Sequence, residues 1–413
     1  MFAAKLVAVL LGVAPAPQAP ARDGRVRLVR VPDGGIQPQA LVDSNGDVEL
    51  LFFRGKPGGG SLFVAKSSDG ARNFSAARPV NGATSCAIAT GTVRSARFVL
   101  GRGDSLHVVW MGGDGAQPRA PHDATPLLYS RLLDGAQEFE PPRNLITEAT
   151  GLDGGFDVAA DGRGAVAVVW HAPPAGGGDE SSRRIWLARS SDDGATFAAE
   201  RAIDPERHGV CPCCGMRAAF VRVADRGDLS LCILYRCALR GTNRDMHELL
   251  VAAPAPKAGG DEKVRSLDLD AWPANGCVMS TAALTNRPAR FDRAGAPGQM
   301  LAAWETRGQI YARDLAGDLA ADATRASRRG PKLAAPGLRE DRKHPRLAVN
   351  NRGEWLLAWT EGTGWQKGGA LAWQLFGADG HPREGAGGRV DGVPVWSFGE
   401  PVALSDGNFV ILY

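Results

Sequence analysis

The sequence predicts an all-β fold built from a repeated unit. Short apolar segments that end on an aromatic residue recur along the whole chain, at intervals of roughly 54 to 69 residues. Most of them follow an earlier short strand and a turn signal such as Asn45-Gly46 or Asp161-Gly162, so each pair indicates a hairpin. Their apolar runs lack strict alternation, which is typical of strands buried on both faces. A repeat of this length, with strands of this kind, predicts a β-propeller.

The aromatic-ended strands give the number of blades. In chain order they cover 48–53, 106–110, 165–170, 229–235, 300–304, 354–359 and 408–413. A third strand is expected in five of these units, at 61–66, 126–130, 184–189, 310–313 and 370–374. The strand count predicts seven blades, or six if one unit is an elaborated loop. Because the last unit ends after two strands, we expect the early strand 25–31 to complete it, so that the N- and C-terminal strands close the ring.

The beginning of the sequence has the composition of an export signal. Lys5 precedes an apolar run over 6–14, which is followed by small residues and prolines. We therefore expect a signal peptide over 1–21 and a single propeller domain over 22–413, in the periplasm or outside the cell. No later segment approaches the roughly 18 uninterrupted apolar residues of a membrane helix, so no membrane span is expected.

Charge limits the classes of partner. The formal net charge is +3, and the Lys and Arg residues are scattered along the chain rather than clustered. Nucleic acid is therefore not expected as a partner. A propeller cavity instead favours a small-molecule or glycan ligand, and any oligomeric state is compatible with the sequence.

One turn carries a recognisable motif. The segment 190–197 contains Ser190, Asp192, Gly194 and Phe197, and it directly follows a predicted third strand. It resembles the Asp-box, or BNR repeat, of the sialidase-like propellers. A degenerate copy contains Ser67, Asp69 and Phe74. The resemblance implies a structural turn between the outer two strands of a blade, in which Ser and Asp bond loop backbone above a packed aromatic side chain.

The same resemblance raises the question of sialidase activity. Sialidases clamp the sugar carboxylate with three arginines and use a tyrosine nucleophile. The family's first arginine lies in an Arg-Ile-Pro motif, but this chain has Ile36-Gln37-Pro38 there, a neutral amide in place of a cation. The four tyrosines lie in or at the ends of apolar strands and are expected in the core. Standard sialidase activity is therefore not expected.

Other charged residues are candidates for the cavity. Arg94, Arg217 and Arg346 are predicted on inner strands, and His344 precedes one of these strands. Candidate carboxylates for a different hydrolytic pair are Asp157, Asp245 and Glu305.

The middle of the chain concentrates sulfur. Cys211, Cys213 and Cys214 lie within four positions, and Cys277 and Met279 follow in a second stretch. The chain here resembles exported bacterial Asp-box proteins of uncharacterised activity, which share a Cys-Pro-Cys-Cys motif, an Arg-Asp pair and a Trp before a further Cys. The matching positions are Arg244, Asp245 and Trp272, but Val278 replaces the usual proline. Both cysteine stretches precede predicted inner strands, so adjacent blades would bring them together at the channel rim.

Three chemistries fit this sulfur cluster. Cys277 can form a disulfide with Cys211, Cys213 or Cys214 and staple two blades. The sulfurs can instead bind copper, with Met216 or Met279, or zinc, with His208 or His247. The third alternative is a redox-active dithiol. Cys232 and Cys237 are expected to be buried thiols in or beside an apolar strand.

The sequence as a whole favours an exported ligand-binding or assembly protein with a sulfur-rich site at the channel rim. The alternative is a glycoside hydrolase, exo-sialidase-like in its use of the cavity, that acts on a glycan.

Overall fold

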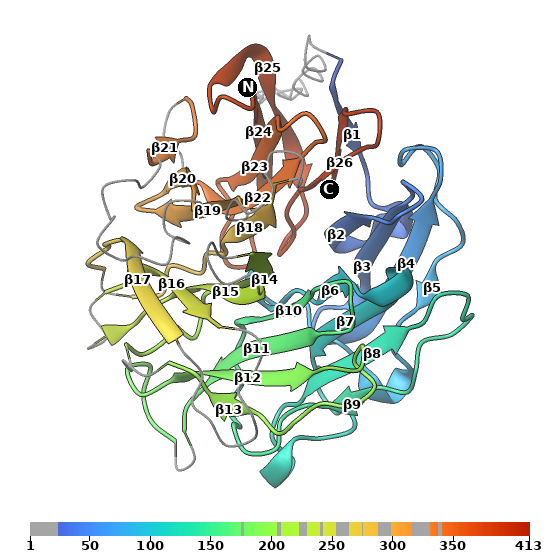
Figure 1. Cartoon of the computed structure of the whole chain (residues 1–413), viewed down its shortest axis with the longest axis vertical. Coiled ribbons are helices and arrows are strands. Elements are labelled where there is room, and N and C mark those ends of the chain that lie inside the picture. The colour runs from blue at the N-terminus through green and yellow to red at the C-terminus, as the bar shows by residue number, and fades with distance from the viewer. Residues whose placement is uncertain are drawn as a thin grey trace, which may run out of the picture.

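In a computed structural model, the chain forms seven β-sheets arranged in a ring (Figure 1). The structure describes residues 24–174, 177–204, 208–222, 229–239, 243–252, 264–274, 276–287, 299–315, 331–337 and 341–413. The expected signal peptide, 1–21, lies outside the described residues. Six sheets have four strands and the seventh has three, and each sheet is one blade. The seven-blade prediction is therefore confirmed, and the six-blade alternative is wrong.

The first three blades follow one another in the chain. Blade 1 contains β2 (Ile36–Val42), β3 (Val48–Lys56), β4 (Gly59–Ser67) and β5 (Arg78–Pro79). Blade 2 contains β6 (Arg97–Leu100), β7 (Leu106–Met111), β8 (Leu127–Leu132) and β9 (Arg143–Asn144). Blade 3 contains β10 (Phe156–Ala160), β11 (Val166–Ala172), β12 (Arg184–Ser190) and β13 (Arg201–Ala202).

The next three blades repeat the order. Blade 4 contains β14 (Arg217–Arg222), β15 (Leu229–Arg236), β16 (Met246–Val251) and β17 (Val264–Asp270). Blade 5 contains β18 (Ala283–Asn286), β19 (Met300–Thr306), β20 (Gln309–Asp314) and β21 (Leu333–Ala334). Blade 6 contains β22 (Lys343–Val349), β23 (Trp355–Glu361), β24 (Gly369–Phe376) and β25 (Pro382–Val393).

The two ends of the described chain share blade 7. It contains β26 (Glu400–Ala403), β27 (Phe409–Leu412) and β1 (Val26–Val29). β1 pairs in parallel with β27, from Val26 opposite Phe409 to Val29 opposite Leu412, and β27 lies between β1 and β26 in the sheet. The predicted ring closure by the early strand is confirmed. Closure pairs strand edges that would otherwise be exposed.

The core consists of layers between neighbouring blades. Each of the seven interblade gaps holds its own cluster of buried apolar residues. The aromatic residues that end the second strands are all buried: Phe53, Trp110, Trp170, Tyr235, Trp304, Trp359 and Tyr413. Because the second strand is covered on both faces, its sequence is apolar throughout, which explains the pattern in the repeat.

The inner strand of each blade borders the central channel. These strands are β2, β6, β10, β14, β18, β22 and β26, and each contacts the inner strands of its neighbours. Five short 3-10 helices whose residues are all among those described lie in connecting loops: η1 (Pro32–Gly34), η2 (Ala83–Ser85), η3 (Thr92–Arg94), η4 (Arg102–Asp104) and η5 (Pro121–Asp123). Among the described residues, no helix has the length and apolar character needed to cross a membrane.

The turn between β12 and β13 is held by its own side chains. Ser190 Oγ donates to Asp192 (2.7 Å) and accepts from the N–H of Gly194 (2.8 Å). Asp192 also accepts from the N–H of Thr196 (2.9 Å), and Phe197 packs against the core between blades 2 and 3. Blade 1 has the same arrangement at Ser67, Asp69, Ala71, Asn73 and Phe74. Both turns lie between the third and fourth strands of their blades.

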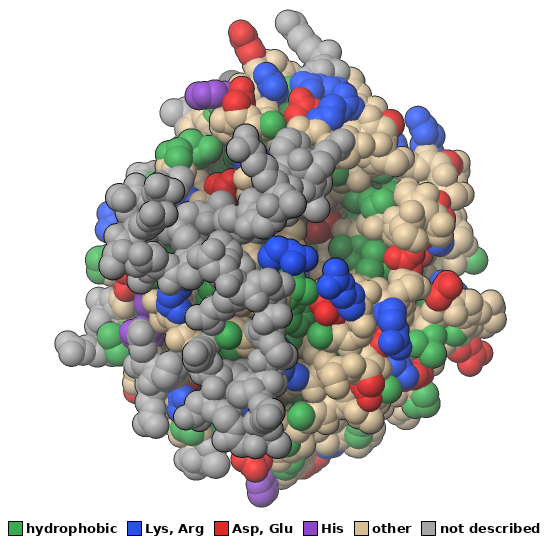
Figure 2. All heavy atoms as spheres, viewed as in Figure 1, with side chains coloured by type: hydrophobic (Ala, Val, Ile, Leu, Met, Phe, Trp, Pro, Cys, Tyr) green, Lys and Arg blue, Asp and Glu red, His purple; other side chains and the backbone are tan. Residues whose placement is uncertain are grey.

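The outer surface carries both signs of charge. On the face in Figure 2, the described Lys and Arg side chains lie interspersed with Asp and Glu.

Candidate functional site

A pocket lies at one mouth of the channel, where the segments that precede the inner strands converge. Its volume, which includes space open to solvent, is about 490 Å³. Its walls come from six blades: Gly91, Thr92, Val93, Arg94, Asp153, Pro212, Cys213, Met279, Lys343, His344, Gly364, Trp365 and Trp396. The pocket therefore brings together four residues that were predicted for the cavity or its rim: Arg94, Cys213, Met279 and His344.

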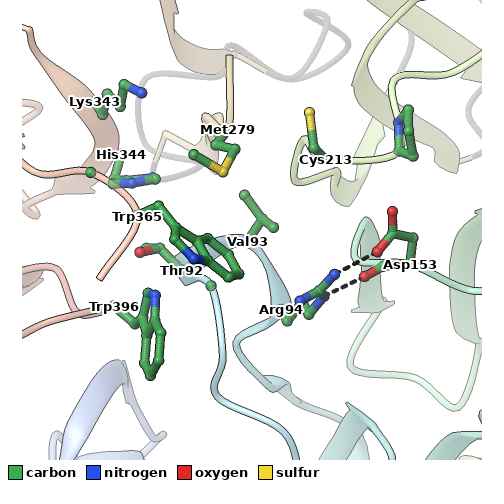
Figure 3. A pocket seen from close by; sticks show the side chains of 13 residues that line it. Thr92, Val93, Arg94, Asp153, Cys213, Met279, Lys343, His344, Trp365 and Trp396 are labelled. Carbon is green, nitrogen blue, oxygen red and sulfur yellow. Dashed lines mark hydrogen bonds and ion pairs between the residues drawn. The ribbon is translucent and has the colours of Figure 1, made fainter. Parts of the chain in front are cut away.

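Two tryptophans form one side of this pocket (Figure 3). Trp365 comes from the loop between β23 and β24, and Trp396 comes from the segment before β26. Their ring centroids lie 5.9 Å apart with the planes at 62°. Trp365 is 50% exposed, an unusual fraction for so large an apolar side chain. Neither tryptophan was predicted as a site residue from the sequence.

The opposite side of the pocket is polar (Figure 3). Arg94 Nη2 donates to Asp153 Oδ1 (2.6 Å), and Arg94 Nε donates to the Asp153 carbonyl (2.6 Å). Arg94 lies in η3 and not on an inner strand, which corrects its expected position. It faces the pocket wall because η3 ends three residues before β6 begins.

Four residues that precede or begin inner strands have left-handed backbone conformations. Their φ angles are 43° at Met279, 54° at His344, 60° at Trp396 and 57° at Gln37, in the four consecutive blades 5, 6, 7 and 1. Non-glycine residues adopt this region rarely, at a cost on the order of 1 kcal/mol or more each. Three of the four line the pocket. Such a concentration of strained backbone is typical of a functional site.

Gln37 fixes part of this arrangement. Its side-chain Nε2 donates to the carbonyls of Ala89 (3.0 Å) and Trp396 (3.1 Å), and its N–H donates to Ser397 Oγ (3.0 Å). The amide that replaces the sialidase arginine is thus occupied in positioning the Trp396 loop.

His344 presents a nitrogen without a protein partner. The side chain is only 5% exposed and lines the pocket, and its Nδ1 has no hydrogen-bond partner among the described residues. Burial, with the nearby positive charges of Lys343 and Arg346, lowers the pKa of His344, so the ring is neutral at pH 7. A neutral imidazole can donate or accept a hydrogen bond, and a ligand in the pocket would supply the missing partner.

Five charged side chains meet in the channel on the inner strands, four of them buried and the fifth, Glu400, partly buried. We call this set the channel ring: Arg97 (β6), Asp157 (β10), Arg217 (β14), Arg346 (β22) and Glu400 (β26). Arg97 interacts electrostatically with the other four, although they come from blades around the whole circle. Their side chains must therefore converge near the channel axis. Arg217, Arg346 and Asp157 were predicted to face this cavity, whereas Arg97 and Glu400 were missed.

The channel ring holds three positive and two negative groups. Arg346 Nε lies 2.8 Å from Glu400 Oε2, an ion pair whose angles fall outside those of a linear hydrogen bond. Arg97 Nε lies 3.9 Å from Asp157 Oδ1. Burial lowers the pKa of Arg346 to about 9 and raises the pKa of Glu400. Arg97 Nε and Nη2 have no hydrogen-bond partner among the described residues, so the ring carries unsatisfied donors.

Cys213 and Cys277 form a disulfide. It joins the segment before β14 to the segment before β18, and so connects blades 4 and 5 beside the pocket. This is one of the three pairings expected for Cys277, and it occupies two of the four predicted sulfur ligands.

The other two cysteines of the motif remain reduced and face each other. Cys211 Sγ lies 3.2 Å from Cys214 Sγ and 3.4 Å from Cys213 Sγ. Burial alone would raise the pKa of Cys214, but the hydrogen bond from Cys211 and the charge of Arg236 lower it to about 7. The same contact raises the pKa of Cys211, so the pair holds one thiol and one group that ionises near neutral pH. A thiol and a thiolate beside a disulfide have the chemistry for thiol–disulfide exchange.

Arg244 and Asp245 do not line the pocket. Arg244 Nη2 donates to Glu180 (2.9 Å), and Asp245 accepts from the N–H of Trp272 (2.5 Å) and from Asn243 Nδ2 (2.6 Å). Both residues lie at the loop between β15 and β16. The tyrosines, all in the described part of the chain, are likewise absent from the pocket lining.

A buried histidine between blades 2 and 3 predicts sensitivity to acid. His107 Nδ1 lies 2.6 Å from the Tyr129 hydroxyl, and burial lowers the pKa of His107 to about 4. Between the unfolded pKa near 6.5 and the folded value, the unfolded chain binds more protons, so stability falls as pH falls. We expect about 2 kcal/mol of unfolding free energy to be lost between pH 7 and pH 5 through His107. Urea denaturation at both pH values measures the loss, which should shrink in His107→Gln; an equal loss in that variant would contradict this assignment.

No protein-family model matches the chain, and no curated protein matches it. Solved structures match it over most of its length. A protein of unknown function from Dyadobacter fermentans is 14% identical, over 81% of this chain and 93% of that one, with a TM-score of 0.49. An alpha-L-arabinanase from Penicillium chrysogenum is 10% identical, over 85% and 95%, with a TM-score of 0.49. A sialidase from Trypanosoma rangeli is 12% identical, with a TM-score of 0.49; the match covers 81% of this chain and 54% of the sialidase.

These identities bear on the fold alone. The strand order, the seven sheets and the closure of the ring by β1 make this chain a seven-bladed β-propeller.

Proposed function

We propose that the protein binds a small saccharide in the pocket at the channel mouth. The observation that carries this proposal is the division of the pocket into an aromatic side, Trp365 and Trp396, and a polar side around Arg94 and Asp153 (Figure 3). A sugar ring has the same division, with C–H groups on its faces and hydroxyls at its edge. Binding pockets commonly combine apolar walls with a few fixed polar groups of this kind.

Each side of the pocket has a separate task in this proposal. The exposed indole of Trp365 stacks on the apolar face of the sugar, and Met279 packs beside it. The Asp153 carboxylate, oriented by Arg94, accepts hydrogen bonds from hydroxyls. His344 Nδ1, which has no hydrogen-bond partner among the described residues, forms a hydrogen bond with another sugar hydroxyl. Binding thus satisfies a buried polar atom.

The cellular location belongs to the same proposal. We infer a periplasmic or secreted protein, because a stable disulfide such as Cys213–Cys277 is favoured by an oxidising compartment.

The first test is calorimetric titration of the full chain with a panel of neutral and acidic mono- and disaccharides. Trp365→Ala is expected to weaken the binding of any ligand found by about tenfold to hundredfold, because it removes an aromatic anchor. Leu133→Ala is the matched control, since Leu133 is also an exposed apolar residue (43%) but does not line the pocket. Absence of binding across the panel, or equal affinity in Trp365→Ala, would overturn the proposal.

The glycoside hydrolase alternative has one specific observation in its favour. The channel ring contains two carboxylates, Asp157 and Glu400, and burial raises the pKa of Glu400 in the direction required of a general acid. Chromogenic glycosides, assayed with the wild type, Asp157→Asn and Glu400→Gln, separate the two functions. Turnover by the wild type that both variants lose would favour hydrolysis over simple binding.

A further inference from the structure

Blade 4 brings a second group of metal-ligating side chains together, away from the pocket. Cys237, Asp245 and His247 each offer one ligand atom, and these atoms lie within 4.8 Å of one another. Cys237 is 1% exposed and His247 is 7% exposed. None of the three lines the pocket or belongs to the channel ring.

The hairpin register explains why these side chains meet. Tyr235 on β15 pairs with His247 on β16, and Arg236 pairs with Met246. One step further, Cys237 N–H donates to the Asp245 carbonyl (3.0 Å). Because side chains alternate between the faces of a strand, Cys237 and Asp245 lie on the same face as the Tyr235–His247 pair. A short local hairpin thus presents a thiol, a carboxylate and an imidazole toward one point.

A fourth donor approaches from another segment. His208 lies in the loop before β14, and its ring centroid is 4.9 Å from that of His247. His208 is partly exposed, whereas Cys237 and His247 are buried.

We propose that Cys237, Asp245 and His247, completed by His208, bind a zinc-class divalent cation. Thiolate, imidazole and carboxylate are the ligands that Zn²⁺ takes in tetrahedral protein sites. A thiolate and a carboxylate carry two negative charges, which one divalent ion neutralises in a buried place. Asp268 lies near enough to interact electrostatically with Cys237 and adds to the negative surroundings.

Hydrogen bonds within the group are compatible with binding. Asp245 accepts from the N–H of Trp272 and from Asn243 Nδ2, one bond to each carboxylate oxygen. Each oxygen keeps a second lone pair for a metal. Asn243 Nδ2 also lies 3.3 Å from Cys237 Sγ. These contacts orient the ligands from outside, as partners of metal ligands do in established sites.

The thiol pair of the Cys-Pro-Cys-Cys motif is less suited to zinc. Its members Cys211 and Cys214 are buried against Ala238, and the third sulfur, Cys213, is held in the disulfide. The pair therefore serves as an internal comparison for the experiment.

The test is metal analysis of the full-length protein, purified without chelator from cells grown with added zinc. We expect stoichiometric zinc in the wild type and in a Cys211→Ala/Cys214→Ala double variant, and background zinc in Cys237→Ala and His247→Asn. Cys86→Ala is the matched control, because Cys86 is also a reduced thiol but is distant in sequence from the proposed ligands. Its Sγ donates a hydrogen bond to the Asp114 carbonyl. Asn243→Ala should retain the site but weaken zinc affinity about tenfold or more.

A second measurement keeps the proposal testable if a variant does not fold. Removing metal from the wild type with a chelator should lower its melting temperature, and added zinc should restore it. Cobalt in place of zinc should give thiolate-to-metal charge-transfer absorption that depends on Cys237. A wild type without zinc and without a thermal response to zinc would overturn the proposal, as would zinc that follows Cys211 and Cys214 instead of Cys237 and His247.

Discussion

Cys277→Ser is expected to lower the free energy of unfolding by about 4 kcal/mol. The Cys213–Cys277 disulfide closes a loop with a sequence separation of 64 residues. In the chain-entropy account, opening a loop of this length adds about 4 kcal/mol of conformational freedom to the unfolded state. The effect should be large because each blade of a propeller is stabilised mainly by packing on its two neighbours, and this bond fixes the seam between blades 4 and 5.

Guanidinium denaturation with and without reductant measures this contribution. The reduced wild type should unfold at the same midpoint as Cys277→Ser, and reductant should not change the midpoint of the variant. Cys86→Ser is the control, since Cys86 forms no disulfide. A midpoint in Cys277→Ser equal to that of the oxidised wild type would show that the bond contributes nothing to stability.

The choice of partner for Cys277 marks the limit of prediction from sequence. Both cysteine stretches were expected at the channel rim, because each precedes an inner strand and a propeller brings such segments together. Cys211, Cys213 and Cys214 lie within one tight turn, however, and their sulfurs lie close together, so spacing alone does not choose among them. Only the turn geometry decides that Cys213 faces blade 5 while Cys211 and Cys214 face each other.

The fold was predictable because its signals are local. A second strand that is buried on both faces is apolar throughout and ends on a buried aromatic residue, as at Trp110 and Trp304. Each blade can therefore be recognised from a stretch of about sixty residues. Ring closure could be predicted because the last repeat unit of the sequence lacked a strand, which the early strand could supply.

The residues that face the channel were harder to predict, because a shift of three residues in the start of a strand changes which side chain faces inward. Arg94 was expected on an inner strand, but β6 begins at Arg97, and Arg97 joins the channel ring. Trp365 and Trp396 come from loops that carry no periodicity. Their shared pocket depends on the closure of the ring and could not be found from spacing.

The channel ring gives the second large expected effect. Arg346→Met should lower the free energy of unfolding by about 3–5 kcal/mol, because it leaves the buried Glu400 carboxylate without its ion-pair partner. The methionine retains much of the packing of the Arg346 stem over Phe398, where the guanidinium carbon lies 3.9 Å from the ring centroid.

Urea denaturation of three variants separates the charge effect from the packing effect. Arg346→Met/Glu400→Gln should recover most of the loss, since the uncompensated charge is then gone. Arg389→Met is the matched control in the same blade, because Arg389 is 42% exposed and pairs with the exposed Asp391. Its second partner, the buried Glu361, keeps its ion pair with Arg342. Its loss should stay below about 1 kcal/mol. A double variant as unstable as Arg346→Met would contradict the ion-pair account.

The pH dependence of the unfolding free energy separates the charge effect from the packing effect more sharply. Burial raises the pKa of Glu400 even beside Arg346, and removing that cation should raise it further. Where the unfolded chain is ionised and the folded Glu400 is still protonated, the folded state binds more protons, so unfolding free energy falls as pH rises. The deficit of Arg346→Met relative to the wild type should therefore be smaller at pH 5 than at pH 8. A deficit caused by lost packing alone would be the same at both pH values, because no proton accompanies it.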